Sequence, residues 1–158
     1  EYARPTKKPR TGRRPSSGLP TANNPMDESF LMTLHSAEDK DLVNPAHAVI
    51  RKDILEIRRT ESGEIFFLCA CCKHLPRRGR AKQSVLSPKS VEGLYQAFMR
   101  FVMDHVPNCE HIPQEIKDLN PRAVQNLAAN NVKKYWVTSA NRLGLRNKED
   151  GKGIVYRP

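Results

Sequence analysis

Three cysteines and one histidine have the types and the spacing of a metal site. Cys69 and Cys72 are separated by two residues, and His105 and Cys109 by three. A zinc ion takes four nitrogen or sulfur ligands in a tetrahedron, and two short pairs on separate elements can supply them. Between Cys72 and His105 lie 32 residues, so a strand and a helix have to fold between the two pairs. We therefore predict one structural Zn²⁺ held by Cys69, Cys72, His105 and Cys109.

Cys71 is a competing thiol inside the first pair. The run 69–72 contains three cysteines for two ligand positions. A two-residue gap lets a tight turn direct both sulfurs at one ion, so we assign Cys69 and Cys72 and expect Cys71 to face the core as a small apolar side chain. His74 and His111 remain as substitute ligands. Three thiols within four residues favour metal binding over disulfides and indicate a reducing compartment.

The second ligand pair lies at the end of a predicted helix. From Val91 to His105, apolar residues recur every three or four positions, which is the pattern of an amphipathic helix. Ser87 with Pro88 offers a start signal, and Pro107 ends the helix because the residue before a proline is pushed out of helical geometry. His105 is therefore expected in the last turn and Cys109 just after it.

The first ligand pair follows a predicted β-hairpin. Two apolar runs, 54–57 and 65–68, flank a polar turn that contains Gly63. The second run leads directly into Cys69. Residues 81–86 predict a third strand, and the loop before it carries several basic side chains.

Signals elsewhere complete an α+β fold. Further helices are predicted within 28–43, 46–51, 113–116 and 120–143. The last is either one helix or a loop followed by a helix from about Asn131, and it ends at Gly144. Residues 153–156 predict an edge strand. We expect a small zinc-stabilised β-hairpin or three-stranded sheet packed on two or three helices, with an extended basic N-terminal arm. The arm comprises residues 1–27, and the zinc-binding α+β domain comprises residues 28–158 with its core at 42–145.

The positive charge is concentrated in two segments. The chain has 27 basic and 17 acidic side chains, which gives a formal net charge of +10. Residues 1–25 contain six basic residues and one acid, and residues 73–82 contain five basic residues and no acid. The remainder has 16 of each sign. The whole excess therefore lies in the arm, whose composition supports no core of its own, and in the loop beside the cysteines.

These two segments predict a nucleic-acid-binding module. Lysine and arginine bind phosphate backbones largely without regard to sequence, and the basic loop lacks the aromatic platforms that typically stack on single strands. We therefore expect contacts to the backbone of DNA or RNA, and a nuclear location. The predicted contact residues are Arg10, Arg13, Arg14, Lys73, Arg77, Arg78, Arg80 and Lys82.

Two other classes of function fit part of the pattern. A basic arm also suits a structural subunit of an acidic or RNA-rich assembly, such as an organellar ribosome or a photosynthetic complex, which would place the protein in a plastid or mitochondrion. The run 104–107 with Asn126 downstream imitates an HNH nuclease, but His105 ends a helical pattern and is already used by the metal. We expect no catalysis and no small-molecule substrate. No membrane span is expected either, since no run approaches the ~18 apolar residues that a span requires.

Several short motifs also resemble a recurring group of sequences. The motifs are the Cys-x2-Cys run with residues 73–76, the stretch 80–84, Tyr95 with Gln96, the His-x3-Cys pair with residues 111–113, and the later segments 135–137 and 143–145. Over residues 42–157 the chain resembles a domain found in predicted proteins of diatoms and related algae. The resemblance implies zinc ligation by the four residues assigned above, and it implies no particular activity. Cys71 departs from the group, which has an aromatic residue there.

Overall fold

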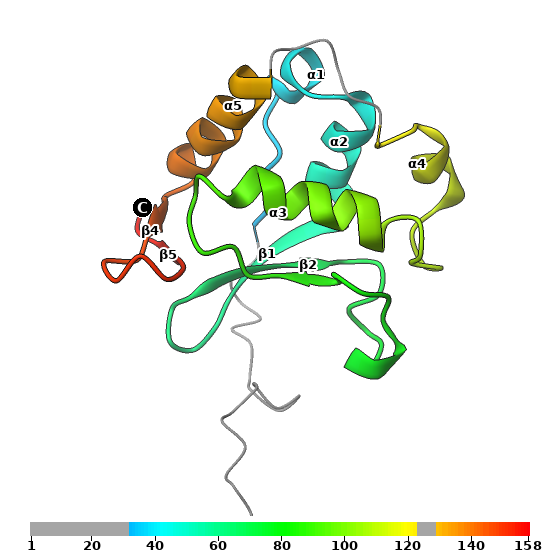
Figure 1. The fold of residues 1–158 in the computed structure, drawn as a ribbon, viewed down its shortest axis with the longest axis horizontal. Helices are drawn as coiled ribbons and strands as arrows, with labels where there is room; N and C mark the ends of the chain where they lie inside the picture. Colours follow the sequence, from blue (N-terminus) through cyan, green and yellow to red (C-terminus); the bar gives the residue numbers. More distant parts are fainter. Residues whose placement is uncertain (1–31, 123–128) are drawn as a thin grey trace, which may run out of the picture.

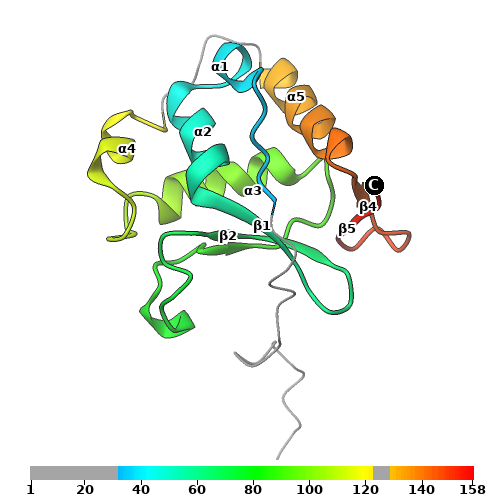
Figure 2. The same cartoon turned by 180° about the vertical axis from the view of Figure 1, so that it is seen from behind.

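The structure, a computed structural model, describes residues 32–122 and 129–158 and has an α+β architecture (Figure 1). The main sheet is antiparallel and consists of β1 (Leu55–Arg59), β2 (Ile65–Cys69) and β3 (Val85–Leu86), in that order. The helices lie together on one side of this sheet, as the two opposite views show (Figures 1 and 2). Within the described ranges, no helix combines the length and the apolar character that crossing a membrane requires.

The hairpin is built from strands whose apolar residues share one face. β1 and β2 pair from Leu55 opposite Cys69 to Arg59 opposite Ile65. Side chains alternate between the two faces of a sheet, so this register places one set of buried residues on a single face: Leu55, Ile57, Ile65, Phe67 and Cys69. In the turn, Gly63 has a φ of +85°, which glycine adopts without strain.

Two helices end in a π-helical turn. α2 (Pro45–Val49) continues into η1 (Ile50–Ile54), which leads directly into β1. α3 (Leu94–Arg100) continues into η3 (Phe101–His105) and runs across the sheet. In a π turn each N–H donates to the carbonyl five residues earlier, and such turns are frequent at functional sites. His105 is thus the last residue of a widened helical turn.

The remaining elements flank this centre. They are α1 (Asp39–Leu42), a 3₁₀ turn η2 (Arg77–Gly79), α4 (Gln114–Asp118), α5 (Ala129–Arg142), β4 (Leu145–Asn147) and β5 (Ile154–Tyr156). β4 and β5 form a second, two-stranded antiparallel sheet, and a bridge between Glu64 and Val155 joins it to the hairpin turn. Gly144 follows the end of α5; its φ is +87°, and a Cβ there would lie 2.9 Å from the Cα of Pro158.

Aromatic side chains join α3 to α5. Trp136 on α5 is fully buried, and its ring centroid lies 4.4 Å from that of Phe98 on α3. Tyr95 lies one turn earlier on α3, and its ring centroid is 5.8 Å from that of the same indole. Trp136 therefore belongs to the core between these two helices.

Most predicted elements are present, with shifted bounds. The α+β class, the hairpin and the helix before His105 are confirmed, although that helix begins at Leu94 rather than Val91. Asn44 caps α2, since its side-chain oxygen accepts the N–H of Ala46 at 2.8 Å. The third strand is shorter than predicted, because only Val85 and Leu86 pair with β2. Residues 1–31 and 123–128, which include the basic arm, lie outside the described part.

Candidate metal centre

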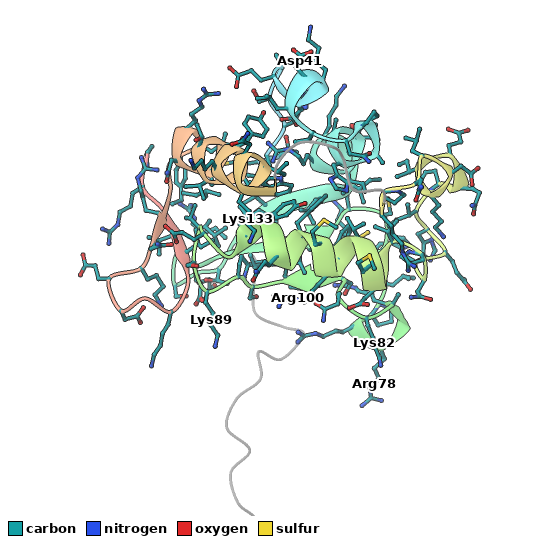
Figure 3. All side chains as sticks on the ribbon, turned by 45° about the horizontal axis from the view of Figure 1, so that its top comes forward. Asp41, Arg78, Lys82, Lys89, Arg100 and Lys133 are labelled. Carbon is teal, nitrogen blue, oxygen red and sulfur yellow. The ribbon has the colours of Figure 1, made fainter. Side chains whose placement is uncertain are left out.

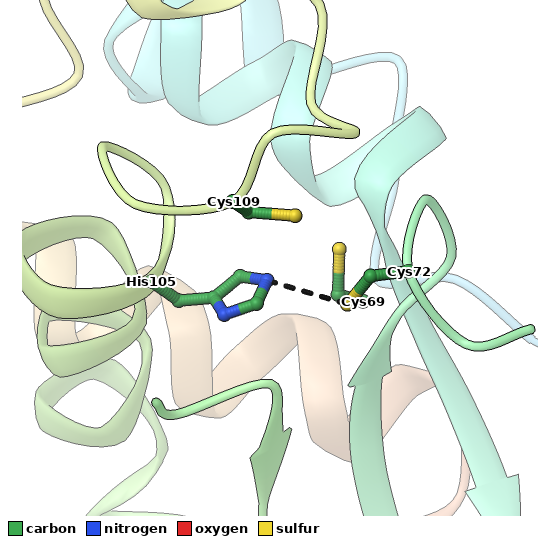
Figure 4. A group of neighbouring side chains, drawn as sticks. All are labelled: Cys69, Cys72, His105 and Cys109. Atoms are coloured by element: carbon green, nitrogen blue, oxygen red, sulfur yellow. Dashed lines mark hydrogen bonds between the residues drawn. The ribbon is translucent and has the colours of Figure 1, made fainter. Parts of the chain in front are cut away.

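Four buried side chains from two parts of the chain meet at one point (Figure 4). Cys69 ends β2 and Cys72 lies in the turn that follows, while His105 ends η3 and Cys109 comes shortly after it. Their ligand atoms all lie within 4.8 Å of one another. The predicted grouping of these four residues is confirmed, and among the described residues no other His, Cys, Asp and Glu side chains form such a group.

One distance between the two pairs matches that expected around a tetrahedral ion. Bonds of about 2.3 Å to sulfur and about 2.05 Å to nitrogen put two sulfurs about 3.8 Å apart, and a sulfur and a nitrogen about 3.6 Å apart. Cys72 Sγ and His105 Nε2 are 3.6 Å apart, as the dashed line in Figure 4 marks. The group can therefore hold one metal ion without rearrangement of this pair.

Hydrogen bonding determines which nitrogen of His105 faces the cysteines. Nδ1 lies 2.9 Å from the carbonyl oxygen of Lys82 and 3.3 Å from that of Ala81. A carbonyl oxygen can only accept, so Nδ1 carries the proton and donates it. The lone pair of Nε2 is then free and points at Cys72 (Figure 4). Holding the second nitrogen in this way is how proteins orient a metal-binding histidine.

Burial sets the protonation of the site. It raises the pKa of Cys69 and, reinforced by the neighbouring thiols, that of Cys72. The N–H groups of Cys71 and Cys72 oppose this at the Cys69 sulfur, but burial outweighs them. A divalent cation reverses the balance because it stabilises the thiolates. Burial also lowers the pKa of His105, which keeps the imidazole in the neutral form that binds metals.

The three substitute ligands lie outside the group. Cys71 is partly buried and packs against the core, and burial raises the pKa of its thiol to about 12. His74 and His111 are exposed and contact each other edge to face. The structure therefore separates the predicted ligands from all three residues that the spacing left as alternatives.

The basic loop is attached to the metal site through its backbone. His105 binds the carbonyl of Lys82 at one end of the loop. At the other end, Arg80 donates from Nε to the carbonyl of Leu75 at 2.9 Å and from Nη2 to that of Lys73 at 2.6 Å. The 3₁₀ turn η2 is held between these contacts.

The predicted nucleic-acid contacts differ in what they are free to bind. Arg77, Arg78 and Lys82 are exposed and have no acidic partner among the described residues. Figure 3 shows Arg78 and Lys82 at the same margin of the molecule, far from Asp41. These three side chains present positive charge to solvent.

The other predicted contacts are engaged or lie outside the described residues. Lys73 pairs with Glu56 at 2.8 Å, and Arg58 binds the same carboxylate at 2.9 Å. The guanidinium of Arg80 holds two carbonyls of its own loop. The residues outside the described part are Arg10, Arg13 and Arg14.

A second buried polar cluster was not predicted. Arg51 is fully buried, and its Nε donates to Asp39 at 2.9 Å while its Nη2 donates to Ser139 at 3.0 Å. The hydroxyl of Tyr135 donates to the other oxygen of Asp39. The guanidinium also lies 4.4 Å from the ring centroid of Trp136. In the sequence Arg51 is followed directly by Lys52 and Asp53, so no pattern marks it as buried or identifies its partners.

Comparisons of the chain with family models, with curated proteins and with solved structures found no match. The resemblance to the algal domain therefore stays a prediction. The arrangement of the four side chains is what supports a metal site.

Proposed function

We propose that the chain is a non-catalytic, zinc-finger-like module that binds nucleic acid through its basic loop and its basic N-terminal arm. The observation that supports it is the position of Arg77, Arg78 and Lys82. They are exposed and unpaired within the described residues, on a loop whose backbone is bonded to a member of the metal group. Such side chains suit the phosphate backbone, which provides most of the affinity in sequence-independent binding.

The donor set favours zinc in a structural role. Three thiolates and one imidazole form one of the usual ligand sets of structural zinc, and four protein ligands leave no position for an activated water. His105 is already one of the four, which argues against its use as a nuclease base. Zinc binding of this kind contributes on the order of 10 kcal/mol to folding in small domains. The ion would therefore hold the hairpin and the α3–η3 helix together.

The test is the salt dependence of binding. The zinc-loaded chain is titrated against a duplex and a single-stranded oligonucleotide at two salt concentrations, by fluorescence anisotropy. Each phosphate contact on duplex DNA contributes about 0.9 to the slope of log K against log salt. We expect the combined variant Arg77→Ala, Arg78→Ala, Lys82→Ala to reduce the slope by about 2 to 3 and to weaken binding at low salt.

A control variant removes the same charge elsewhere. Lys40, Lys52 and Lys152 are exposed, and replacing all three by alanine lowers the net charge equally. We expect this variant to retain most of the affinity and the slope. Equal losses in both variants, or binding that does not respond to salt, would overturn the proposal. Recovery of the chain in a large complex that survives high salt would instead favour a structural subunit of an assembly.

A further inference from the structure

Two exposed histidines lie together outside the four-ligand group, and each occupies the same place in its own turn. His74 is two residues after Cys72, and His111 is two residues after Cys109. In both turns the residue after the histidine donates its N–H to the cysteine carbonyl, at 3.0 Å in the first turn and 3.3 Å in the second. The two turns are therefore built alike.

Each turn is also anchored to the interior on both sides of its histidine. The cysteine before it is buried, and the residue after it contacts the core: Ile112 is buried and Leu75 is partly buried against the same cluster. The backbone positions of His74 and His111 are thus set by buried neighbours. Both imidazoles are nevertheless open to solvent.

The separation of the ring centroids matches that of two histidines on one tetrahedral ion. Their centroids are 5.1 Å apart and their planes are at 87°. With a metal–nitrogen bond of about 2.05 Å, each ring centre lies about 3.2 Å from the ion, and two tetrahedral ligands have ring centres about 5.2 Å apart. Within the described residues, none of the four ring nitrogens has a hydrogen-bond partner. A lone pair on each ring is therefore available to an ion.

We propose that His74 and His111 form a second metal site, which takes a late divalent transition metal such as zinc, nickel or copper. Imidazole nitrogen suits these ions, and water would complete the coordination shell. Two protein ligands at the surface make this site open and exchangeable, whereas the Cys69 group is closed and buried. The proposal does not depend on nucleic-acid binding.

The experiment uses the full chain with one equivalent of zinc bound. Titration with Ni²⁺ in a calorimeter is expected to show one further ion per chain, with a dissociation constant on the order of micromolar. Either His74→Asn or His111→Asn alone should weaken this binding about tenfold or more, because one of two protein ligands is lost. The double variant should abolish it. Zinc content and melting temperature are measured for every variant, which shows that the first site and the fold are intact.

His35 provides the matched control, because it is another exposed histidine and lies in a different part of the chain. His35→Asn is expected to bind Ni²⁺ as the unaltered chain does. The proposal is overturned if the zinc-loaded chain takes up no Ni²⁺. Uptake that survives the double variant, or that His35→Asn reduces equally, would show that the ion binds elsewhere and would also overturn it.

Discussion

At the scale of single residues, the proton on His105 connects two parts of the molecule. Because Nδ1 donates to the Lys82 carbonyl, Nε2 is left as the ligand atom. One imidazole therefore serves the metal group on one side and the basic loop on the other. Its burial lowers its pKa and keeps it neutral, so it remains ready to bind a cation.

The roles of the adjacent cysteines give a prediction. Cys72→Ser should weaken metal binding by about a hundredfold or more, because it removes one of four ligands. Cys71→Ser should leave the affinity nearly unchanged, since Cys71 lies outside the group. Co²⁺ substituted for zinc reports thiolate ligation by its absorption, and competition with a chelator gives the affinity. If Cys71→Ser lost the ion and Cys72→Ser kept it, the ligand assignment would be wrong.

Residue spacing predicted that these four side chains would meet, because metal coordination demands short, local pairs. The same reasoning did not find the partners of Arg51. Asp39 is 12 residues away from it and Ser139 is 88 residues away. No local rule connects such distant residues, which come from α1, η1 and α5 and meet only in the folded chain. A buried ion pair of this kind is therefore visible only in the folded chain.

At the scale of elements, local patterns predicted the hairpin and the helix before His105. The two π turns were not predicted, because an apolar stripe specifies the exposed and buried faces but not one extra residue in the last turn. β4 was missed for another reason. It has only three residues, Leu145–Asn147, and two of them are exposed, so no alternation marks it. Its strand conformation depends on pairing with Ile154–Tyr156.

The basic loop gives a prediction at this scale. In η2 the N–H of Gly79 donates to the carbonyl of Pro76 at 2.8 Å, and Arg80 holds the backbone on which this turn rests. Arg80→Met should therefore speed hydrogen exchange at the Gly79 amide by about tenfold, since losing two charged hydrogen bonds destabilises the closed loop by 1 kcal/mol or more.

Arg78→Met is the matched control, because Arg78 is exposed and has no bonded partner among the described residues. It should leave the exchange rate of Gly79 unchanged while removing the same charge. The measurement is amide exchange by NMR on the zinc-loaded chain. Identical rates in both variants would mean that Arg80 does not brace the loop.

At the scale of the whole molecule, a buried histidine makes stability depend on pH. His47 is buried, and its Nε2–H donates to the carbonyl of Pro121 at 2.6 Å. Burial, and to a smaller extent the charge of Arg51, lowers its pKa below the usual 6.5. As pH falls through 6.5 the unfolded chain takes up a proton before the folded chain does. The free energy of unfolding should therefore be highest above about pH 6.5 and decrease below it.

This dependence is measured by urea unfolding of the zinc-loaded chain at pH 7.5 and pH 5.5. His105 and the thiols also respond to pH, so the contribution of His47 is the difference between the unaltered chain and His47→Gln. His47→Gln should be less stable than the unaltered chain at both pH values. Its free energy of unfolding should also decrease less between pH 7.5 and pH 5.5. An equal loss in both proteins would show that His47 does not contribute.

Met32, the first residue that the structure describes, pairs with β1, and this limits which ligands can contact both Met32 and the basic loop. Met32 exchanges two backbone hydrogen bonds with Ile57, at 3.3 Å and 2.8 Å, so the chain enters the fold along the outer side of β1. The basic loop precedes β3, at the opposite border of the same sheet. Met32, β1, β2 and β3 are four successive backbones, so with about 4.8 Å between neighbours Met32 and β3 lie about 14 Å apart. A ligand that contacts both Met32 and the loop before β3 therefore has to extend across the sheet.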